Sequence, residues 1–355
     1  MAKRKSAKTS ISEEEGAPDP LHPRLAVNLF GHEAAEDLFL SAFNAGALHH
    51  AWLLTGERGI GKATFAYRAA RFLLSQGQAA PARETSSLAV PASHPVARQI
   101  GAGAHPSLFV LDANAEPGGL IGVDSVRKLR SFLNLTSPGG WRAVIIDPAN
   151  DLTIASANAL LKAIEEPPPR TAFFLVSHGA SSVMPTIRSR CIKLAFRPLD
   201  RSDFRSAVSA ACAAGGMDEP DETETGKLLA LSAGSPGRAV ELIAGGVLAL
   251  AGKVERIIEG LPRLDHALVQ EVIQSASGPR NAETFARLCD LIEERIGERA
   301  KMEAVDQPDP AVAAAWAGLW QTVRGRRLEL EALNLDKGAF LVSTFSDMER
   351  IAKKN

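Results

Sequence analysis

A glycine-rich segment carries residue types that bind phosphate. It reads Gly56-Glu57-Arg58-Gly59-Ile60-Gly61-Lys62, follows the apolar run Ala51–Leu54 and precedes an amphipathic stretch. Glycines let backbone N–H groups converge on an anion, a helix N-terminus adds partial positive charge, and Lys62 adds a full one. The alternative is a tight strand-to-helix turn whose lysine is solvated. Because strand, loop and helix follow in the required order, a phosphate site is the favoured interpretation.

The positions that would handle magnesium and water lack the necessary groups. Hydrolysing proteins of this kind carry Ser or Thr after the lysine to hold Mg²⁺, whereas this chain has Ala63, and Thr64 points about 100° away around the helix. The run Ala143–Ile146 ends in Asp147, where a magnesium-linked aspartate would stand, but Pro148 follows in place of an acid. Asp147 alone is equally well explained as a strand-end aspartate that accepts nearby N–H groups. Together the two losses predict that a nucleotide binds here, if at all, without hydrolysis.

Five short apolar runs predict the sheet that positions this loop. They alternate with helical segments, which is the pattern of a parallel sheet buried on both faces. The first domain is therefore predicted to be α/β. The runs are Ala51–Leu54, Leu108–Leu111, Ala143–Ile146, Phe173–Val176 and Ile192–Phe196.

Shifts in composition predict the domain boundaries. Residues 1–20 mix Lys, Ser, Glu and Pro without apolar periodicity, which predicts a disordered tail. Residues 21–198 are the predicted α/β domain, and the stretch 75–104 within it, rich in Ala, Pro and Ser, is predicted to be a loosely structured insertion.

The remainder is predicted to be helical. Residues 199–245 form a small predicted lid, interrupted by an acidic loop at 217–225. Residues 246–355 form a predicted helical domain, with a polar connection between two helices at 297–310. Large apolar residues recur there at helical spacing, as they do in cores and in interfaces. They include Trp316 and Trp320.

Composition excludes several classes of protein. The chain has 355 residues, 45% hydrophobic and 23% charged, as expected for a soluble globular protein of two or three domains. A formal net charge of -1 argues against nucleic-acid contact as the whole role of the chain. Three cysteines without close spacing argue against a disulfide framework and predict a cytoplasmic protein. The sequence shows neither an apolar run of membrane-spanning length nor a secretory signal.

Further motifs identify a family. They are His49-His50-Ala51-Trp52, Asn158-Ala159-Leu160-Leu161-Lys162, Glu165-Glu166-Pro167-Pro168, Ser189-Arg190-Cys191 and Gly234-Ser235-Pro236-Gly237-Arg238-Ala239. In this order they resemble the bacterial clamp-loader subunits of DNA polymerase III, over about residues 23–240. Beyond this stretch only the helical character and Asn334-Leu335-Asp336 look similar. The resemblance implies an AAA+ domain, a helical lid and a C-terminal helical oligomerisation domain.

Ala63 and Pro148 distinguish between branches of this family. The motor subunits (tau/gamma) keep the hydroxyl and the acidic pair, so the chain looks like the non-hydrolysing delta-prime branch. The resemblance then implies an accessory subunit of the polymerase holoenzyme that helps the ATP-driven loading of a sliding clamp onto primed DNA. It implies no required cofactor, with ATP or ADP at most bound and not hydrolysed. The implied partners are the tau/gamma and delta subunits, with the clamp and primed DNA reached through the complex.

The resemblance also implies roles for single residues. Arg190 corresponds to an arginine finger that reaches a neighbouring subunit's ATP, because a guanidinium offers forked donors to phosphate. The alternative is that Arg190 pairs with a local carboxylate. Ser177 corresponds to the first nucleotide-sensing residue, or is a strand-end hydroxyl, and Arg238 corresponds to the second, or is a surface cation near Glu241. The run Glu165–Pro168 is interpreted as architectural.

One departure from the family concerns zinc. Members usually carry a four-cysteine zinc module between the first helix and the second strand, but residues 75–107 contain no cysteine. His94 and His105 alone make a poor zinc site, so no zinc is predicted.

Two other classes stay open. An ATPase motor such as a branch-migration helicase would need a magnesium ligand and a catalytic acid from other positions. A metabolic phosphoryl-transfer enzyme would need a small-molecule pocket with its own acid.

Overall fold

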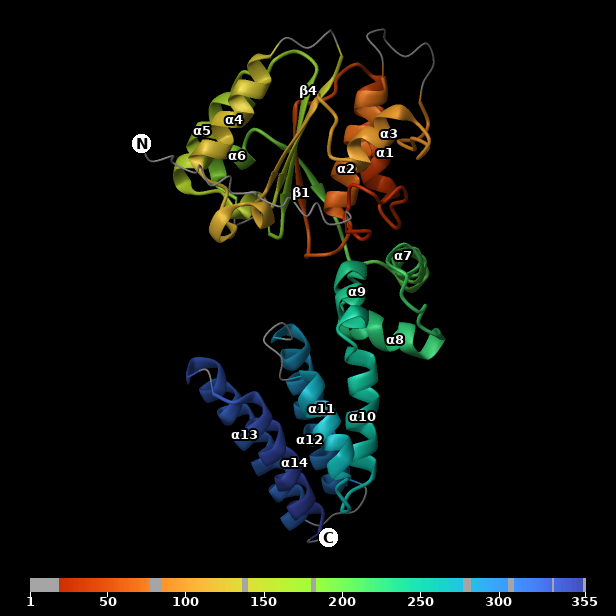
Figure 1. Ribbon diagram of the computed structural model, residues 1–355, viewed down its shortest axis with the longest axis vertical. Coiled ribbons are helices and arrows are strands. Elements are labelled where there is room, and N and C mark those ends of the chain that lie inside the picture. The colour runs from red at the N-terminus through yellow and green to blue at the C-terminus, as the bar shows by residue number, and fades with distance from the viewer. Residues whose placement is uncertain are drawn as a thin grey trace, which may run out of the picture. The chain divides into compact units, whose positions relative to one another are not determined.

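The computed structural model describes residues 19–353, apart from 77–84, 136–139, 180–182, 277–281, 306–309 and 334 (Figure 1). The tail predicted at residues 1–20 therefore lies almost wholly outside the described residues. Contacts divide the chain into two compact units: the first contains residues 1–219 and 233–237, and the second contains residues 220–232 and 238–355.

A five-stranded parallel sheet organises the first unit, in the order β2-β3-β4-β1-β5. Every residue of β1 and β4 is buried, since helices cover both faces of the sheet, and this is why these strands read as continuous apolar runs. All five predicted strands are present, which confirms the α/β class. The strands are β1 (Ala51–Thr55), β2 (Leu108–Asp112), β3 (Arg142–Asp147), β4 (Thr171–Ser177) and β5 (Ile192–Ala195).

Alternate strand residues serve two separate cores. Trp52 and Leu54 of β1 pack with α1, α2 and α3 on one face, whereas Ala51 and Leu53 pack with α4, α5 and α6 on the other (Figure 1). The helices are α1 (Glu33–Asn44), α2 (Lys62–Ser75), α3 (Pro95–Gly101), α4 (Val123–Asn134), α5 (Ile154–Glu165) and α6 (Pro185–Arg188). Short 3₁₀ turns span Ala113–Ala115, Pro117–Gly119 and Ala149–Asp151.

The stretch 75–104 is more ordered than its composition predicts. It contains α3, which begins with His94 as N-cap and Pro95 at the first helical turn. Leu88 and Ile100 are buried against the core of the first unit. The prediction of a loose insertion is therefore wrong for this part, because a few apolar side chains at the right spacing anchor a segment that composition alone describes as a loop.

Three helices in the predicted lid region and a set of helices after it make up most of the rest. α7 (Arg201–Gly215) belongs to the first unit and α8 (Glu222–Leu231) to the second, while α9 (Pro236–Ala244) begins in the first and continues in the second. The predicted boundaries at residues 199 and 246 remain predictions. The second unit continues with α10 (Val247–Glu259), α11 (His266–Ala276), α12 (Ala282–Val305), α13 (Pro310–Leu333) and α14 (Lys337–Ala352).

Two predicted loops are shorter in the structure. The acidic loop at 217–225 ends at Asp221, which accepts from the Glu224 backbone in a capping box that starts α8. The prediction of a polar connection at 297–310 is wrong for residues 297–305, because α12 continues through Gly297 to Val305. A Cβ on Gly297 would make only an ordinary van der Waals contact with Trp320, at 3.7 Å from its Nε1, so the helix tolerates this glycine without requiring it.

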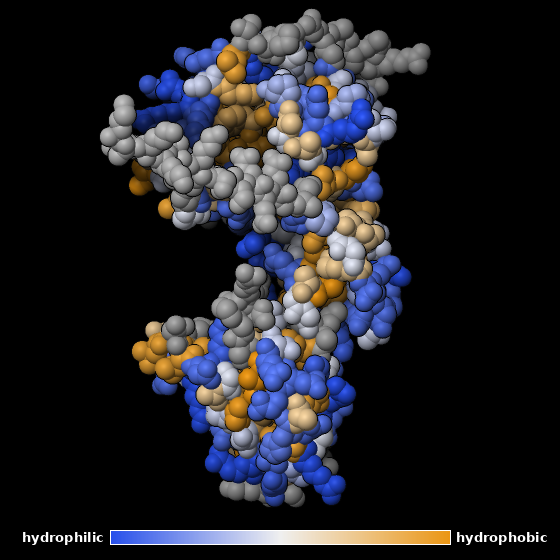
Figure 2. Space-filling model, viewed as in Figure 1, coloured by the Kyte–Doolittle hydropathy of each residue, from blue (hydrophilic) through white to orange (hydrophobic). Residues whose placement is uncertain are grey.

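Both tryptophans of the helical region belong to the core of the second unit. Trp316 is 1% exposed, and Trp320 packs against the same cluster. Apolar surface appears instead where α13 leads toward α14 (Figure 2). Leu328 and Leu333 are each 68% exposed there, and Leu335 is 50% exposed. Within the described part of the chain, no helix is both long and apolar enough to cross a bilayer.

Candidate nucleotide site and arginine finger

The phosphate loop follows β1 and turns into α2, as predicted. Its glycines adopt backbone conformations that other residues avoid, with φ of +76° at Gly59 and +108° at Gly61. At Gly56 the constraint is space, because a Cβ there would lie 2.5 Å from the carbonyl oxygen of Phe196. The sequence pattern of glycines is thus explained by the geometry of a tight strand-to-helix loop.

Lys62 turns back onto its own loop. The side chain is 3% exposed, and its Nζ donates to the carbonyl of Gly56 at 2.7 Å and to that of Glu57. The carbonyl dipoles offset the buried positive charge. A phosphate bound in the loop would have to replace these carbonyls as acceptors of the lysine.

Three consecutive carbonyls of the loop are held from outside it. His32 Nε2 lies 2.8 Å from the Ile60 oxygen, the Ser235 hydroxyl donates to Arg58 at 2.8 Å, and the Gly237 amide donates to Gly59 at 2.8 Å. Sequence reasoning did not find these anchors. Gly234–Ala239 was recognised only as a family motif, and nothing local to His32 indicates a partner 28 residues away.

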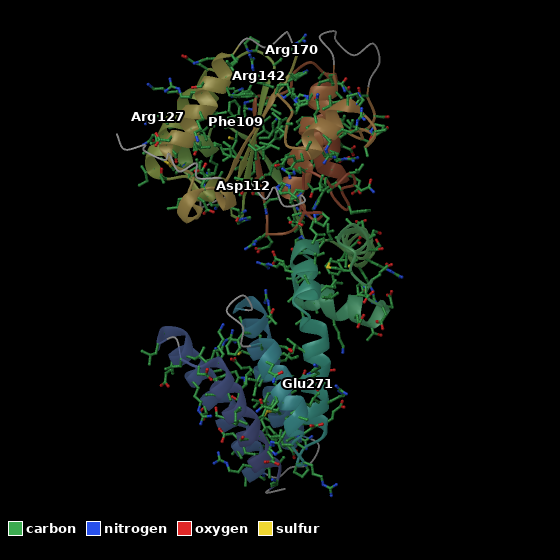
Figure 3. The ribbon with its side chains drawn as sticks, viewed as in Figure 1. Phe109, Asp112, Arg127, Arg142, Arg170 and Glu271 are labelled. Carbon is green, nitrogen blue, oxygen red and sulfur yellow. The ribbon has the colours of Figure 1, made fainter. Side chains whose placement is uncertain are left out.

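Asp147 lies at the carboxyl edge of the sheet, level with Asp112 of β2. Figure 3 shows Asp112 at this edge and Arg142 and Arg170 at the opposite one. Burial first, and then the charge of Asp112, raises the pKa of Asp147 to about 6. Neither Ala63 nor Pro148 has a side chain that could ligate Mg²⁺ or activate water.

Ser177 is committed to its own turn. The fully buried hydroxyl donates to the Gly179 carbonyl at 2.7 Å and accepts from the Gly179 amide at 3.2 Å. The next residue, His178, has its amide bound to Asn150 Oδ1 at 3.0 Å. Burial, followed by the charges of Lys62 and Arg58, lowers the pKa of the His178 imidazole. The positive charges of the loop therefore act on the imidazole of His178, a residue that the sequence did not suggest. A sensing role for Ser177 remains a prediction.

Arg190 lies at the opposite edge of the sheet from the chain's own loop. β5 is parallel to β1, with Ile192 level with Trp52 and Ala195 level with Thr55. The loop therefore begins beyond the carboxyl end of β1, whereas Arg190 precedes the amino end of β5. Strand residues rise about 3.3 Å each, so roughly 13 Å of sheet or more separates them. Arg190 is thus poorly placed to act on its own loop.

The guanidinium of Arg190 has partners within its own chain. Nη2 lies 2.5 Å from Oε1 of Glu165, and Nη1 donates to the Thr186 carbonyl at 2.9 Å. The alternative of a local carboxylate partner is therefore realised in this structure. Arg238 belongs to the second unit, and its assignment as a sensor remains a prediction.

The two histidines considered for zinc each accept a backbone hydrogen bond, and His94 is the N-cap of α3. His94 Nδ1 accepts from the Val96 amide at 3.2 Å, and His105 Nδ1 accepts from the Ser107 amide at 3.2 Å. Among the residues that the structure describes, no group of three His, Cys, Asp or Glu is placed to hold a metal. The absence of zinc remains a prediction.

The chain is similar in sequence to known subunits of DNA polymerase III. The family described as "DNA polymerase III, delta subunit" matches residues 31–200. The delta' subunit of Pseudomonas aeruginosa is 39% identical over 217 residues, 61% of each chain. The family match and this identity support the identification of the chain as a relative of the DNA polymerase III delta' subunits. The Escherichia coli K12 delta' subunit is 34% identical over 211 residues, 58% of each chain, so the matches span about three fifths of these relatives.

More distant relatives extend further along the chain. The gamma/tau subunit of Mycobacterium tuberculosis H37Rv is 28% identical over 82% of this chain and 53% of its own. A gamma-subunit-related protein of Thermotoga maritima gives a TM-score of 0.40 at 16% identity over 88% of this chain and 99% of that one, too low a score to add to the argument. The parallel sheet, the phosphate loop and the similarity to DNA polymerase III subunits together indicate an AAA+ fold, as the resemblance implied.

Proposed function

We propose that the chain is a non-hydrolysing subunit of the DNA polymerase III clamp loader in the cytoplasm. One observation carries the proposal: a phosphate loop with intact backbone geometry has Ala63 and Pro148 at the two positions where hydrolysis needs a metal ligand and an acid. A protein that keeps the fold without these groups contributes through assembly. Similarity to the delta' subunits of DNA polymerase III supports a place in DNA replication.

In this proposal the subunit joins a ring with the tau/gamma motor subunits and the delta subunit. ATP bound by the motors drives the opening of the sliding clamp and its loading onto primed DNA. The chain requires no cofactor of its own, and ATP or ADP in its loop would be a structural ligand. Exposed Leu328, Leu333 and Leu335 support assembly through the helical region, since exposed apolar patches mark interaction surfaces.

Arg190 is the residue proposed to act on ATP. A guanidinium stays charged and offers forked donors to phosphate oxygens. The position of Arg190 at the edge of the sheet away from its own loop supports action on a neighbouring subunit rather than in cis.

Steady-state ATPase of the purified chain tests the loss of hydrolysis. We expect no turnover above background, with and without primed DNA. Turnover that disappears in Lys62→Ala would locate real chemistry in this loop and contradict the proposal. Co-purification with the motor and delta subunits tests the assembly, and a stable stoichiometric complex is the expected result.

A further inference from the structure

The ion pair between Arg190 and Glu165 bears on how the proposed finger is engaged. It joins the last residue of α5 to the turn after α6, with Nη2 and Oε1 2.5 Å apart. The side chains are 39% and 42% exposed, so the pair lies at the surface, where another anion can reach it. A carboxylate therefore occupies part of the donor fork that a phosphate would use.

Both partners stand on well-anchored backbone. Glu165 ends α5, whose residues Leu160 and Ile164 are fully buried in the core under the sheet. The Arg190 amide donates at 3.0 Å to the carbonyl of Ile187, which is buried in the same core. Because neither backbone has to be ordered for the side chains to meet, the pair forms at low entropic cost within a single subunit.

We propose that Glu165 holds Arg190 in the free subunit and that the nucleotide phosphate of a neighbouring subunit must displace this carboxylate before the finger acts. The inference rests on the proposed role of Arg190. A γ-phosphate carries more negative charge than one carboxylate and more acceptor oxygens, so ATP competes for the guanidinium better than ADP does. Glu165 is thus a positioning residue that acts through Arg190, and it makes engagement of the finger depend on a triphosphate.

Glu165→Gln tests this competition, because it keeps the shape of the side chain and removes its charge. Glu166→Gln is the matched control: the neighbouring residue is also exposed, and its backbone amide closes α5 on the Lys162 carbonyl whichever side chain is present. The readout is the clamp- and DNA-stimulated ATPase of the reconstituted complex, measured over a range of ATP concentrations with and without added ADP. Thermal melting of each variant alone checks that it folds.

The expected result is a split between KM and kcat. With Glu165→Gln the ATP concentration for half-maximal rate should fall by about two- to fivefold, the size that exposed ion pairs reach, with kcat unchanged. Inhibition by ADP should strengthen, because the discriminating carboxylate is gone. Glu166→Gln should match the unaltered complex in all three quantities.

The outcomes separate this inference from the proposed function. If Arg190→Ala lowers the ATPase while Glu165→Gln leaves KM and ADP inhibition unchanged, the finger stands and the competition is refuted. If Glu165→Gln lowers kcat as Arg190→Ala does, Glu165 supports the engaged finger, which also overturns the competition. If Arg190→Ala has no effect, the finger and this inference fall together.

Discussion

Gly237→Ala should weaken the packing of residue 237 against Gly59 of the phosphate loop. A Cβ on Gly237 would lie 2.7 Å from Cα and 2.9 Å from the carbonyl oxygen of Gly59, and both are backbone atoms that cannot rotate away. Overpacking of this kind costs about 1–3 kcal/mol, and the adjacent hydrogen bond from the Gly237 amide to Gly59 would be strained as well. We therefore expect the free energy of unfolding to fall by about 1–3 kcal/mol.

Thermal melting followed by circular dichroism measures the effect. For a unit of roughly 200 residues, this loss corresponds to a fall in Tm of about 2–12 °C. Gly226→Ala in α8 is the control, since a Cβ there meets nothing within 4 Å and alanine favours the helix. A Gly237→Ala protein that melts at the same temperature as the unaltered chain would refute the contact between the loop and residues 235–237.

Three further predictions concern pH, assembly and metal. Burial lowers the pKa of the imidazoles of His22, His32, His50, His105 and His178. The unfolded chain therefore binds more protons, and the free energy of unfolding should fall from pH 7.5 to 6. Below about pH 6 the raised pKa of Asp147 acts in the opposite sense and offsets part of the loss. Urea titrations across this range check both, and a stability that is constant or rises down to pH 6 would contradict the signs. Leu333→Glu, at an exposed site, should leave Tm within about 1 °C yet reduce co-elution with the motor subunits, unlike Val342→Glu on α14; equal co-elution of both would place the interface elsewhere. Metal analysis of protein purified without chelator should give well under one zinc per chain, and one equivalent lost in His94→Ala would refute the expectation.

The sequence predicted the centre of the sheet well because β1, β3 and β4 are buried on both faces. Runs such as Phe173–Val176 consist of apolar residues only, so their burial can be predicted without knowledge of the surrounding structure. The continuity of α12 at Gly297 could not be predicted, since a glycine in a polar stretch is more typical of a loop than of a helix interior. The same holds for α3, whose Ala- and Pro-rich sequence reads as a loop until the burial of Ile100 is known.

The sequence predicted which residues make up the candidate site but not which other residues they contact. The loop glycines, Lys62, Asp147 and the two substitutions are local sequence features. The partners of these residues are not: Arg190 meets Glu165 because α5 and α6 pack on the same face of the sheet, although 25 residues separate them in sequence. Likewise, Ser235 reaches the carbonyl of Arg58 across 177 residues. Such contacts depend on tertiary register, which single-sequence patterns do not contain.

Arg190→Ala in the reconstituted complex tests the central claim most directly. The measurement is the clamp- and DNA-stimulated ATPase at limiting ATP, with the subunit shown to be present at full stoichiometry. Arginine fingers elsewhere contribute about three to five orders of magnitude in rate, but a ring with several sites should lose less, because the other sites keep their own. We predict a complex that assembles normally and hydrolyses ATP more slowly, with little rescue by Arg190→Lys, since a point charge does not reproduce the fork. An Arg190→Ala complex that assembles and turns over ATP at the unaltered rate would contradict the account.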